Sequence, residues 1–154
     1  LFRSVSEDVA KEAHELALRL AQGFELAGIL AIELFVTKDE RVIVNELAPR
    51  PHNSGHYTIE ACSFDQFDAH IRGIAGWPLE QPELLKPAVM VNVLGQHVAP
   101  TRALIAEHPE WNMHDYCKAE VRHDRKMGHI TVLTDDTRQT VADLERTGCW
   151  DDLK

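Results

Sequence analysis

Hydrophobic residues recur every three to four positions near the start of the chain, which predicts an amphipathic helix ended by Gly23 or Gly28. The stripe consists of Val9, Ala13, Leu16, Ala17, Leu20 and Ala21. Just before it, Ser4-x-x-Glu7 has the form of a capping box, whose side chains bond the free amides of a first helical turn. The pattern therefore predicts a capped helix that buries one face.

The next pattern is that of a β-hairpin. Residues 30–36 and 42–45 are mostly apolar and β-branched, and they flank the polar turn Lys38-Asp39-Glu40. A two-residue loop at Asp39 and Glu40 sets Glu33 opposite Glu46, and a three-residue loop makes the two glutamates diagonal neighbours. Either loop places two carboxylates close together on one face of the hairpin.

Two facing carboxylates repel each other, so their pairing favours a cation between them. Magnesium fits because it takes oxygen ligands, usually one or two carboxylates together with phosphate oxygens. Strand alternation also puts Glu33 and Glu46 on faces with apolar neighbours, which predicts that both are half-buried and paired. The alternative is that the two glutamates simply face solvent, as most hairpin glutamates do.

The loop that follows Glu46 is dense in groups that bind anions. Arg50 offers a planar fork for carboxylate, bicarbonate or phosphate, and His52 and Asn53 add hydrogen-bond donors. Prolines on both sides of Arg50 hold the loop extended, and a Ser-Gly pair after Asn53 allows close backbone approach. A zinc site at His52 and His56 is an alternative, although their spacing suits a helix that the proline and glycine disfavour.

The rest of the chain alternates between helices and strands. A second amphipathic helix carries Phe64, Phe67, Ile71 and Ile74, a stripe expected to pack in the core, and ends at Gly76. After a linker at residues 81–87, the pattern predicts strands at 88–94, 116–121 and 127–133 and helices at 101–107 and 136–146, with residues 148–150 in a frayed end. The fold class is α/β (α+β).

A basic cluster stands out in a chain whose formal net charge is −9. It comprises Lys118 and the run Arg122-His123-Asp124-Arg125-Lys126, and two cations placed together suit a phosphate. The alternative is a solvated turn between two strands.

Composition narrows the class of protein. At 154 residues the chain suits one domain or one and a half small ones, and 44% hydrophobic residues can build a core. No apolar run approaches the roughly 20 residues of a membrane span, and the acidic balance argues against nucleic acid as a partner. Three scattered cysteines suit ordinary thiols in a reducing cytoplasm better than a disulfide framework.

The hairpin and its loop resemble a known enzyme family. Glu33-Leu34-Phe35-Val36 and the run Asn45-Glu46-Leu47-Ala48-Pro49-Arg50-Pro51-His52-Asn53-Ser54-Gly55-His56 are similar to carboxyaminoimidazole ribonucleotide synthase, of the ATP-grasp superfamily. Shorter similarities follow at 61–63, 66–67, 70–72, 78–79, 88–95 and 125–130. The resemblance covers most of the chain from about Gly28 to Leu133.

The resemblance implies an ATP-driven carboxylation in purine biosynthesis. Members of the family activate bicarbonate as carboxyphosphate and transfer the carboxyl group to aminoimidazole ribonucleotide. Carried over by position, the metal ligands for Mg²⁺ would be Glu33 and Glu46. Bicarbonate would be held by Arg50, His52 and Asn53, and ATP would contact Phe35 and Asn45. The substrate 5′-phosphate would be held by Lys118 and Arg125, with Arg50 also on the substrate side.

This sequence departs from the family at two points. The family usually has Arg-Pro-Gly-Arg-Lys, and this chain has His123-Asp124 in place of Pro-Gly. The exchange removes the two turn residues and adds an acid beside Arg125, which is expected to alter the loop and weaken phosphate binding. The N-terminal domain and the lid with its nucleotide-binding lysines do not appear in these residues. We therefore expect the C-terminal half of an ATP-grasp domain at residues 1–80, a small mixed β-rich C-terminal domain at 86–154, and a missing N-terminal half as partner.

Other functions remain open from the sequence. Another ATP-grasp carboxylase or ligase shares paired metal carboxylates and an anion-binding arginine, and a non-catalytic module for assembly is a different class of answer. The resemblance favours a cytoplasmic enzyme that is inactive as this chain alone. A homodimer is left open.

Overall fold

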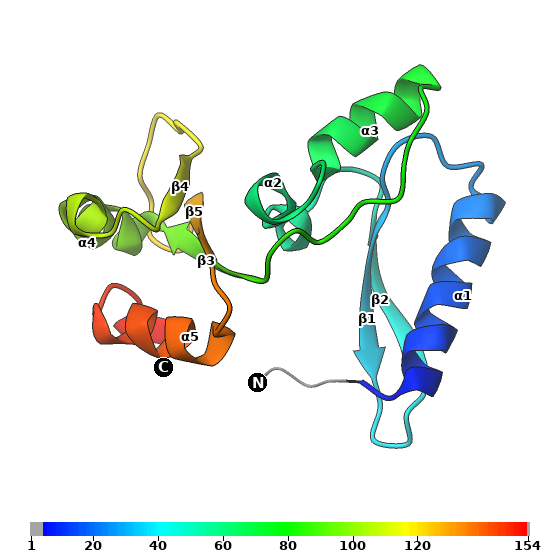
Figure 1. Cartoon of the computed structure of the whole chain (residues 1–154), viewed down its shortest axis with the longest axis horizontal. Coiled ribbons are helices and arrows are strands. Elements are labelled where there is room, and N and C mark those ends of the chain that lie inside the picture. The colour runs from blue at the N-terminus through cyan, green and yellow to red at the C-terminus, as the bar shows by residue number, and fades with distance from the viewer. Residues whose placement is uncertain (1–4, 154) are drawn as a thin grey trace. The chain divides into compact units, whose positions relative to one another are not determined.

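A computed structural model describes residues 5–153, which form two compact units (Figure 1). The first unit contains the chain up to Gly55 together with Gln66–Gln81, and the second contains His56–Asp65 and the chain from Pro82 onward. Sequence analysis places one boundary between residues 80 and 86, whereas in the structure 56–65 also packs with the second unit. Within the described residues, every helix is too short or too polar to cross a bilayer.

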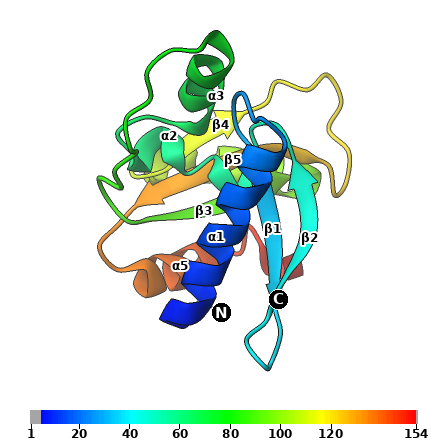
Figure 2. The ribbon, with the colours of Figure 1, turned by 90° about the vertical axis from the view of Figure 1, so that its right-hand side faces the viewer.

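In the first unit, one helix packs along a two-stranded hairpin. Helix α1 (Glu7–Gly23) contacts both β1 (Ala31–Val36) and β2 (Val42–Ala48), and Figure 2 shows it running beside the strands. Its N-cap is Ser6, whose hydroxyl accepts the amide hydrogen of Val9 at 3.4 Å. The predicted helix is thus confirmed, while the Ser4 of the expected capping box lies outside the described residues.

The hairpin reaches the expected pairing by a different route. Its loop has three residues, Lys38 to Glu40, and Glu40 takes a left-handed conformation with φ of 60°. That loop alone would make the glutamates diagonal, but a β-bulge at Asn45 inserts one residue into β2. Beyond the bulge, Glu33 pairs directly with Glu46. Of the two loops considered from the sequence, the structure has the three-residue one, and the close pairing of the glutamates is confirmed.

The expected burial of this hairpin face is also wrong. Glu33 and Glu46 are both exposed, and Phe35, on the same face as Glu33, is 59% exposed. The predicted second helix is confirmed as α3 (Gln66–Ala75), yet its apolar stripe is exposed too, with Ile71 at 59%. Periodicity identified these elements but could not show which of their apolar faces are covered in this chain.

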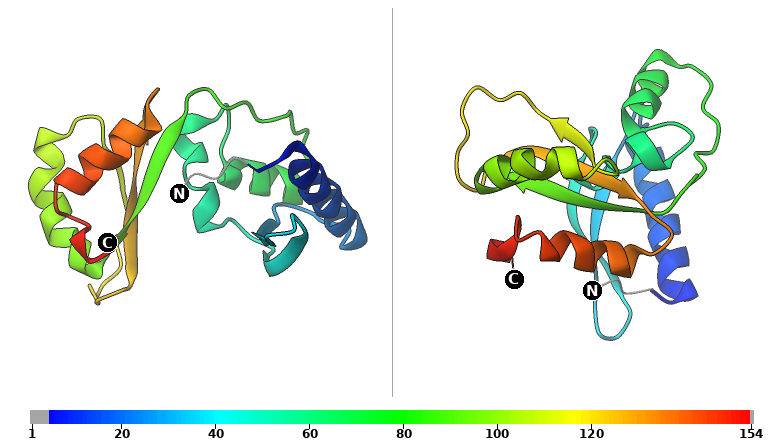
Figure 3. Two further views of the ribbon diagram at one scale, coloured as in Figure 1. Left: turned by 90° about the horizontal axis from the view of Figure 1, so that it is seen from below. Right: turned by 60° about the vertical axis from the view of Figure 1, so that its left-hand side comes forward.

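The second unit is a three-stranded antiparallel sheet with helices on both faces. Its strand order is β3-β5-β4, so that β5 is central. The elements are α2 (Thr58–Ala61), β3 (Ala88–Leu94), α4 (Val98–Leu104), β4 (Asn112–Asp115), β5 (Lys126–Leu133) and α5 (Thr137–Arg146). Helices α4 and α5 cover one face and α2 lies on the other, as Figure 3 shows.

The hydrophobic core of this unit lies under α4 and α5. Ile130 of β5 is fully buried there, together with Leu144 of α5 and Trp111. Cys149 and Trp150 belong to the same core at 4% and 6% exposure, and the indole of Trp150 donates to the carbonyl of Asn92 at 2.9 Å. The prediction that residues 148–150 form a frayed end is therefore wrong.

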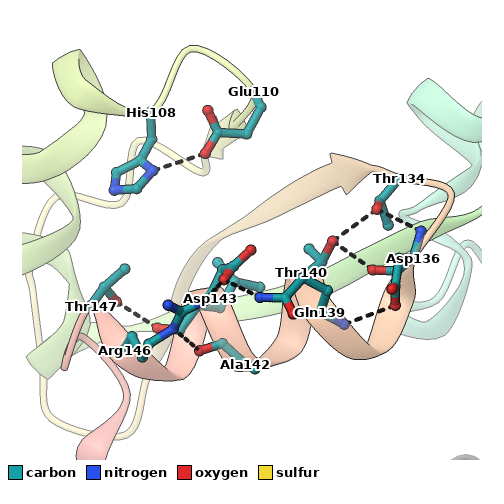
Figure 4. A network of polar contacts seen from close by, with 11 residues as sticks. His108, Glu110, Thr134, Asp136, Gln139, Thr140, Ala142, Asp143, Arg146 and Thr147 are labelled. Carbon is teal, nitrogen blue, oxygen red and sulfur yellow. Dashed lines mark hydrogen bonds and ion pairs between the residues drawn. The ribbon is translucent and has the colours of Figure 1, made fainter.

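The predicted last helix is confirmed as α5, which begins with a side-chain cap. Asp136 is its N-cap and accepts the amide hydrogen of Gln139 at 2.9 Å, as drawn in Figure 4. The strand expected at 116–121 is wrong, because β4 ends at Asp115 and Cys117 has a φ of 52°, which ends an extended strand. The expected helix at 101–107 is shifted: α4 starts at Val98, and a 3₁₀ turn follows it.

Candidate functional site

The bulge in β2 gathers oxygen-bearing side chains around Glu33. Glu46 is its cross-strand partner, and the amide nitrogen of Asn45 donates to Glu33 Oε2 at 3.2 Å. A bulge turns two successive residues toward one residue of the facing strand, which is why Asn45 and Glu46 both serve this site. The sequence pattern did not predict the bulge, so the hydrogen bond from Asn45 to Glu33 was not expected.

His52 brings the loop to this hairpin. Its Nε2 lies 3.6 Å from Glu33 Oε1, and its Nδ1 lies 2.9 Å from the hydroxyl of Ser54. The backbone amide of Ser54 also donates to Nδ1, at 3.4 Å. Because an amide can only donate, Nδ1 is the acceptor in the neutral ring and the ring proton sits on Nε2, facing the carboxylate.

Arg50, Asn53 and Phe35 are placed close to this group along the chain. Arg50 is exposed, and one of its guanidinium nitrogens donates to the carbonyl of Pro51 at 3.1 Å. Asn53 opens the short 3₁₀ turn that follows His52 and is half-buried. Phe35 lies two residues beyond Glu33 on β1. All belong to the first unit, together with the two glutamates and Asn45.

The residues of this site fit a magnesium ion. Magnesium takes few protein ligands and keeps phosphate oxygens and water for its remaining positions. Glu33 and Glu46 supply two exposed carboxylates at paired positions, and the Asn45 amide holds one of them in place. Between residues 5 and 153, no three histidine, cysteine or acidic side chains gather as a metal cluster, so a closed protein cage such as zinc prefers is absent there.

The basic cluster lies in the second unit. The ammonium of Lys118 donates to the carbonyl of Lys126 at 2.6 Å and sits 5.6 Å from the ring centre of Tyr116. Arg125 is exposed and donates to the carbonyl of Glu120 at 3.2 Å. The structure thus brings Lys118 to the residue directly after Arg125.

At His123-Asp124, where the sequence departs from the family pattern, the chain makes a left-handed turn. Asp124 takes a φ of 59°, which suits the glycine of the family pattern and which aspartate tolerates better than most residues. Its amide donates to the side chain of Gln96 at 2.9 Å, and its carboxylate accepts from the same amide group at 3.1 Å. Aspartate therefore fits the left-handed turn, and its carboxylate adds one hydrogen bond to Gln96 that a glycine could not make.

A column of aromatic rings on the α2 face of the sheet was missed from the sequence. His129 of β5 stacks between His114, its partner on β4, and His56, with ring centres 4.5 and 4.8 Å away. The Tyr116 hydroxyl lies 2.9 Å from His129 Nδ1, and His114 Nε2 lies 2.5 Å from Glu60 of α2. The rings come from three separate parts of the chain, so the sequence pattern alone did not show that they meet.

Burial sets the charge of the central ring. His129 is 1% exposed, and this burial, followed by the charges of His114 and His56, lowers its pKa from 6.5 to about 4. His129 is therefore neutral at physiological pH. His56, proposed above as a zinc ligand with His52, belongs to this column in the second unit, whereas His52 contacts Ser54 and Glu33 in the first.

Two family matches cover most of the chain. Residues 2–67 match the ATP-grasp domain, and residues 88–143 match the phosphoribosylaminoimidazole carboxylase C-terminal domain. An N5-carboxyaminoimidazole ribonucleotide synthase of Staphylococcus aureus is 47% identical over 89% of this chain and 37% of its own length. The chain is homologous to part of this synthase family. Both the resemblance found in the sequence and the α/β fold class are confirmed.

Solved structures agree with this assignment. The S. aureus N5-carboxyaminoimidazole synthetase complexed with ADP is 46% identical, with a TM-score of 0.85 over 91% of this chain and 38% of its own. The Aspergillus clavatus synthase, in complex with ADP and 5-aminoimidazole ribonucleotide, is 34% identical, with a TM-score of 0.83 over 94% of this chain and 40% of its own. The chain thus spans less than half the length of these relatives.

Proposed function

We propose that this chain carries the metal-binding and bicarbonate-binding part of an ATP-dependent ligase that carboxylates aminoimidazole ribonucleotide. The observation that carries the proposal is the pairing of Glu33 with Glu46 in the hairpin, with His52 of the following loop beside Glu33. The A. clavatus relative is in complex with ADP and 5-aminoimidazole ribonucleotide, which are the product nucleotide and the carboxyl acceptor of the proposed reaction. The candidate site, which has two carboxylates on paired strands and a loop of hydrogen-bond donors beside them, suits phosphoryl transfer to a small anion.

Each residue of the first unit has a role in this proposal. Glu33 and Glu46 would hold magnesium, which neutralises charge on the ATP phosphates and aligns the phosphoryl group when it is bound. Arg50, His52 and Asn53 would hold bicarbonate, whose oxygen takes the γ-phosphoryl group as ADP leaves. The site thereby keeps the carboxyphosphate product among donors that neutralise its charge.

The remaining roles concern the two nucleotides. Phe35 offers an exposed ring for the adenine of ATP, and Asn45 orients Glu33 beside the phosphates. Lys118 and Arg125 would hold the 5′-phosphate of the ribonucleotide, whose amine attacks the carboxyl carbon and releases phosphate. Bicarbonate as substrate, a cytoplasmic location and a homodimer remain predictions from the sequence.

The test is ADP formation by a chimera. This chain replaces the matched 138 residues of the S. aureus synthase, and turnover is measured with ATP, magnesium, bicarbonate and aminoimidazole ribonucleotide. We expect ADP formation that requires the ribonucleotide in the chimera, and none in the chain alone. ADP formation that ignores the ribonucleotide would favour another ATP-grasp ligase, and a folded but silent chimera would favour a non-catalytic assembly module.

Two arginine variants sharpen the test. Arg50→Ala should raise the KM for bicarbonate by roughly tenfold or more and leave the KM for ATP unchanged, because a charge-assisted fork to the anion is lost. Arg41→Ala is the matched control, since Arg41 is also exposed on the first unit but pairs with Asp39 at 2.7 Å. Equal bicarbonate KM values in the two variants would remove Arg50 from the site.

A further inference from the structure

Gln66, the first residue of α3, is bound to the backbone of His52 by two hydrogen bonds. The His52 amide donates to Gln66 Oε1 at 2.8 Å, and Gln66 Nε2 donates to the His52 carbonyl at 2.9 Å. The side-chain amide thus satisfies both backbone groups of one residue, an arrangement that permits only one orientation of the amide. Gln66 is 7% exposed, so water competes little with these bonds.

The turn after His52 is built to fit this amide. The His52 carbonyl also accepts the amide hydrogen of Gly55 at 2.9 Å, which uses both of its lone pairs. A Cβ on Gly55 would lie 2.5 Å from Gln66 Oε1, which is closer than atoms can approach. Gly55 has no positive φ, so the close approach of Gln66, and not the backbone conformation, is what requires glycine here.

The geometry points to Gln66 as a positioning residue for bicarbonate, which acts by fixing His52. With its backbone held on both sides, His52 turns its ring between Ser54 and Glu33 and keeps the Nε2 proton toward the carboxylate. Gln66 thus joins the loop that carries Arg50, His52 and Asn53 to α3, and the contact of His52 with Glu33 joins the same loop to β1. We call the two hydrogen bonds between Gln66 and the His52 backbone the clamp. The inference rests on the proposed function for the identity of the anion, whereas the clamp can be tested in this chain without any substrate.

The first experiment measures the clamp in the chain itself. In ¹⁵N-labelled protein, the imidazole nitrogens of His52 should show one neutral tautomer, with the proton on Nε2. Gln66→Met preserves the length of the side chain and removes both hydrogen bonds, so we expect a mixture of tautomers with an unchanged circular dichroism spectrum. Gln22→Met, an exposed position on α1, is the control and should keep the parent tautomer.

The second experiment measures the consequence in the chimera. Gln66→Met should raise the KM for bicarbonate by roughly 10 to 100-fold while the KM for ATP changes by less than about twofold, because misplacing a binding group by about 1 Å has effects of this size. Gly55→Ala disturbs the same contact, because the added Cβ displaces the Gln66 amide. It should also raise the KM for bicarbonate and leave the KM for ATP nearly unchanged. It keeps the inference testable if Gln66→Met does not fold.

The outcomes separate the two proposals. A parent bicarbonate KM in both variants, with the His52 tautomer unchanged, would show that Gln66 only fills space. A fall in kcat with both KM values unchanged would indicate loss of folded protein and would also overturn the inference. If the parent chimera forms no ADP, the proposed function fails, and the tautomer of His52 in the chain still decides whether the clamp exists.

Discussion

We expect the second unit to lose stability on mild acidification, because His129 is neutral when folded. In the folded state its ring is buried between His56 and His114, with Tyr116 at Nδ1, and Glu60 pairs with His114. Its Nε2 has no hydrogen-bond partner among the described residues, so the charged ring, which has a proton on both nitrogens, would bury an N–H without an acceptor. Acid therefore favours the unfolded chain, where this histidine is free to ionise.

The magnitude follows from the shift in pKa. His129 titrates near 6.5 when unfolded and at about 4 when folded. Because the folded pKa is the lower one, its contribution is fully present above about pH 6.5 and is lost as the pH falls toward 4. A difference of about 2.5 pKa units corresponds to roughly 3 kcal/mol, lost at up to about 1.4 kcal/mol per pH unit.

Urea denaturation followed by tryptophan fluorescence measures this loss. Trp111 and Trp150 are buried in the second unit, so their emission reports its unfolding, while Trp77 of the first unit is 63% exposed. His129→Gln keeps a hydrogen-bonding group near Tyr116 but cannot titrate. The comparison therefore uses the slope of stability against pH between about 6.5 and 4.5, and not the absolute stability of each variant.

The slopes decide the matter. The parent chain should lose about 2 kcal/mol more than His129→Gln over this interval. His123→Gln is the matched control, because His123 is 74% exposed and should leave the parent slope unchanged. Equal slopes for the parent and His129→Gln would refute the argument that folding holds this ring neutral.

Two further predictions concern the metal site and a tight backbone contact. Glu46→Gln in the chimera should lower kcat at least about tenfold without altering the circular dichroism spectrum, because a magnesium ligand is lost, and parent rates at saturating magnesium would exclude that role. Gly95→Ala should destabilise the second unit by about 2 kcal/mol or more, since the added Cβ would overlap the backbone carbonyl of Arg122. Gly23→Ala, with no atom within 4 Å of its added Cβ, is the control in urea denaturation, where equal midpoints would contradict the clash.

Local patterns predicted the elements of the fold better than their burial. Helix α5 was found at nearly its observed bounds because helical period is a local signal, and its N-cap Asp136 is a local feature as well. Trp150 was misplaced because its partners, Trp111 and the carbonyl of Asn92, are far away in sequence. The exposed stripe of α3 was missed for the same reason, since period shows that a face is apolar but not what covers it.

The residues of the candidate site were predicted from their chemistry. Their geometry depends on two irregularities of the hairpin that offset each other and that the sequence does not show. The paired glutamates needed the three-residue loop and the bulge at Asn45 together, since either one alone moves Glu46 off its partner. Residue types pointed to a metal and an anion, but the clamp by Gln66 was invisible because its partner groups are backbone atoms 14 residues away.

The metal ligands and the anion donors are held in place in different ways. The carboxylates sit on strands, where the ladder of backbone hydrogen bonds fixes them, while the anion donors sit on a loop that has no ladder of its own. A loop gains comparable precision only when side chains bond its backbone, and Gln66 does this at the residue whose ring contacts Glu33. We therefore expect substitutions on the hairpin to act on metal affinity and substitutions at the Gln66 contact to act on the anion, so that the two sets of effects can be separated by varying magnesium and bicarbonate independently.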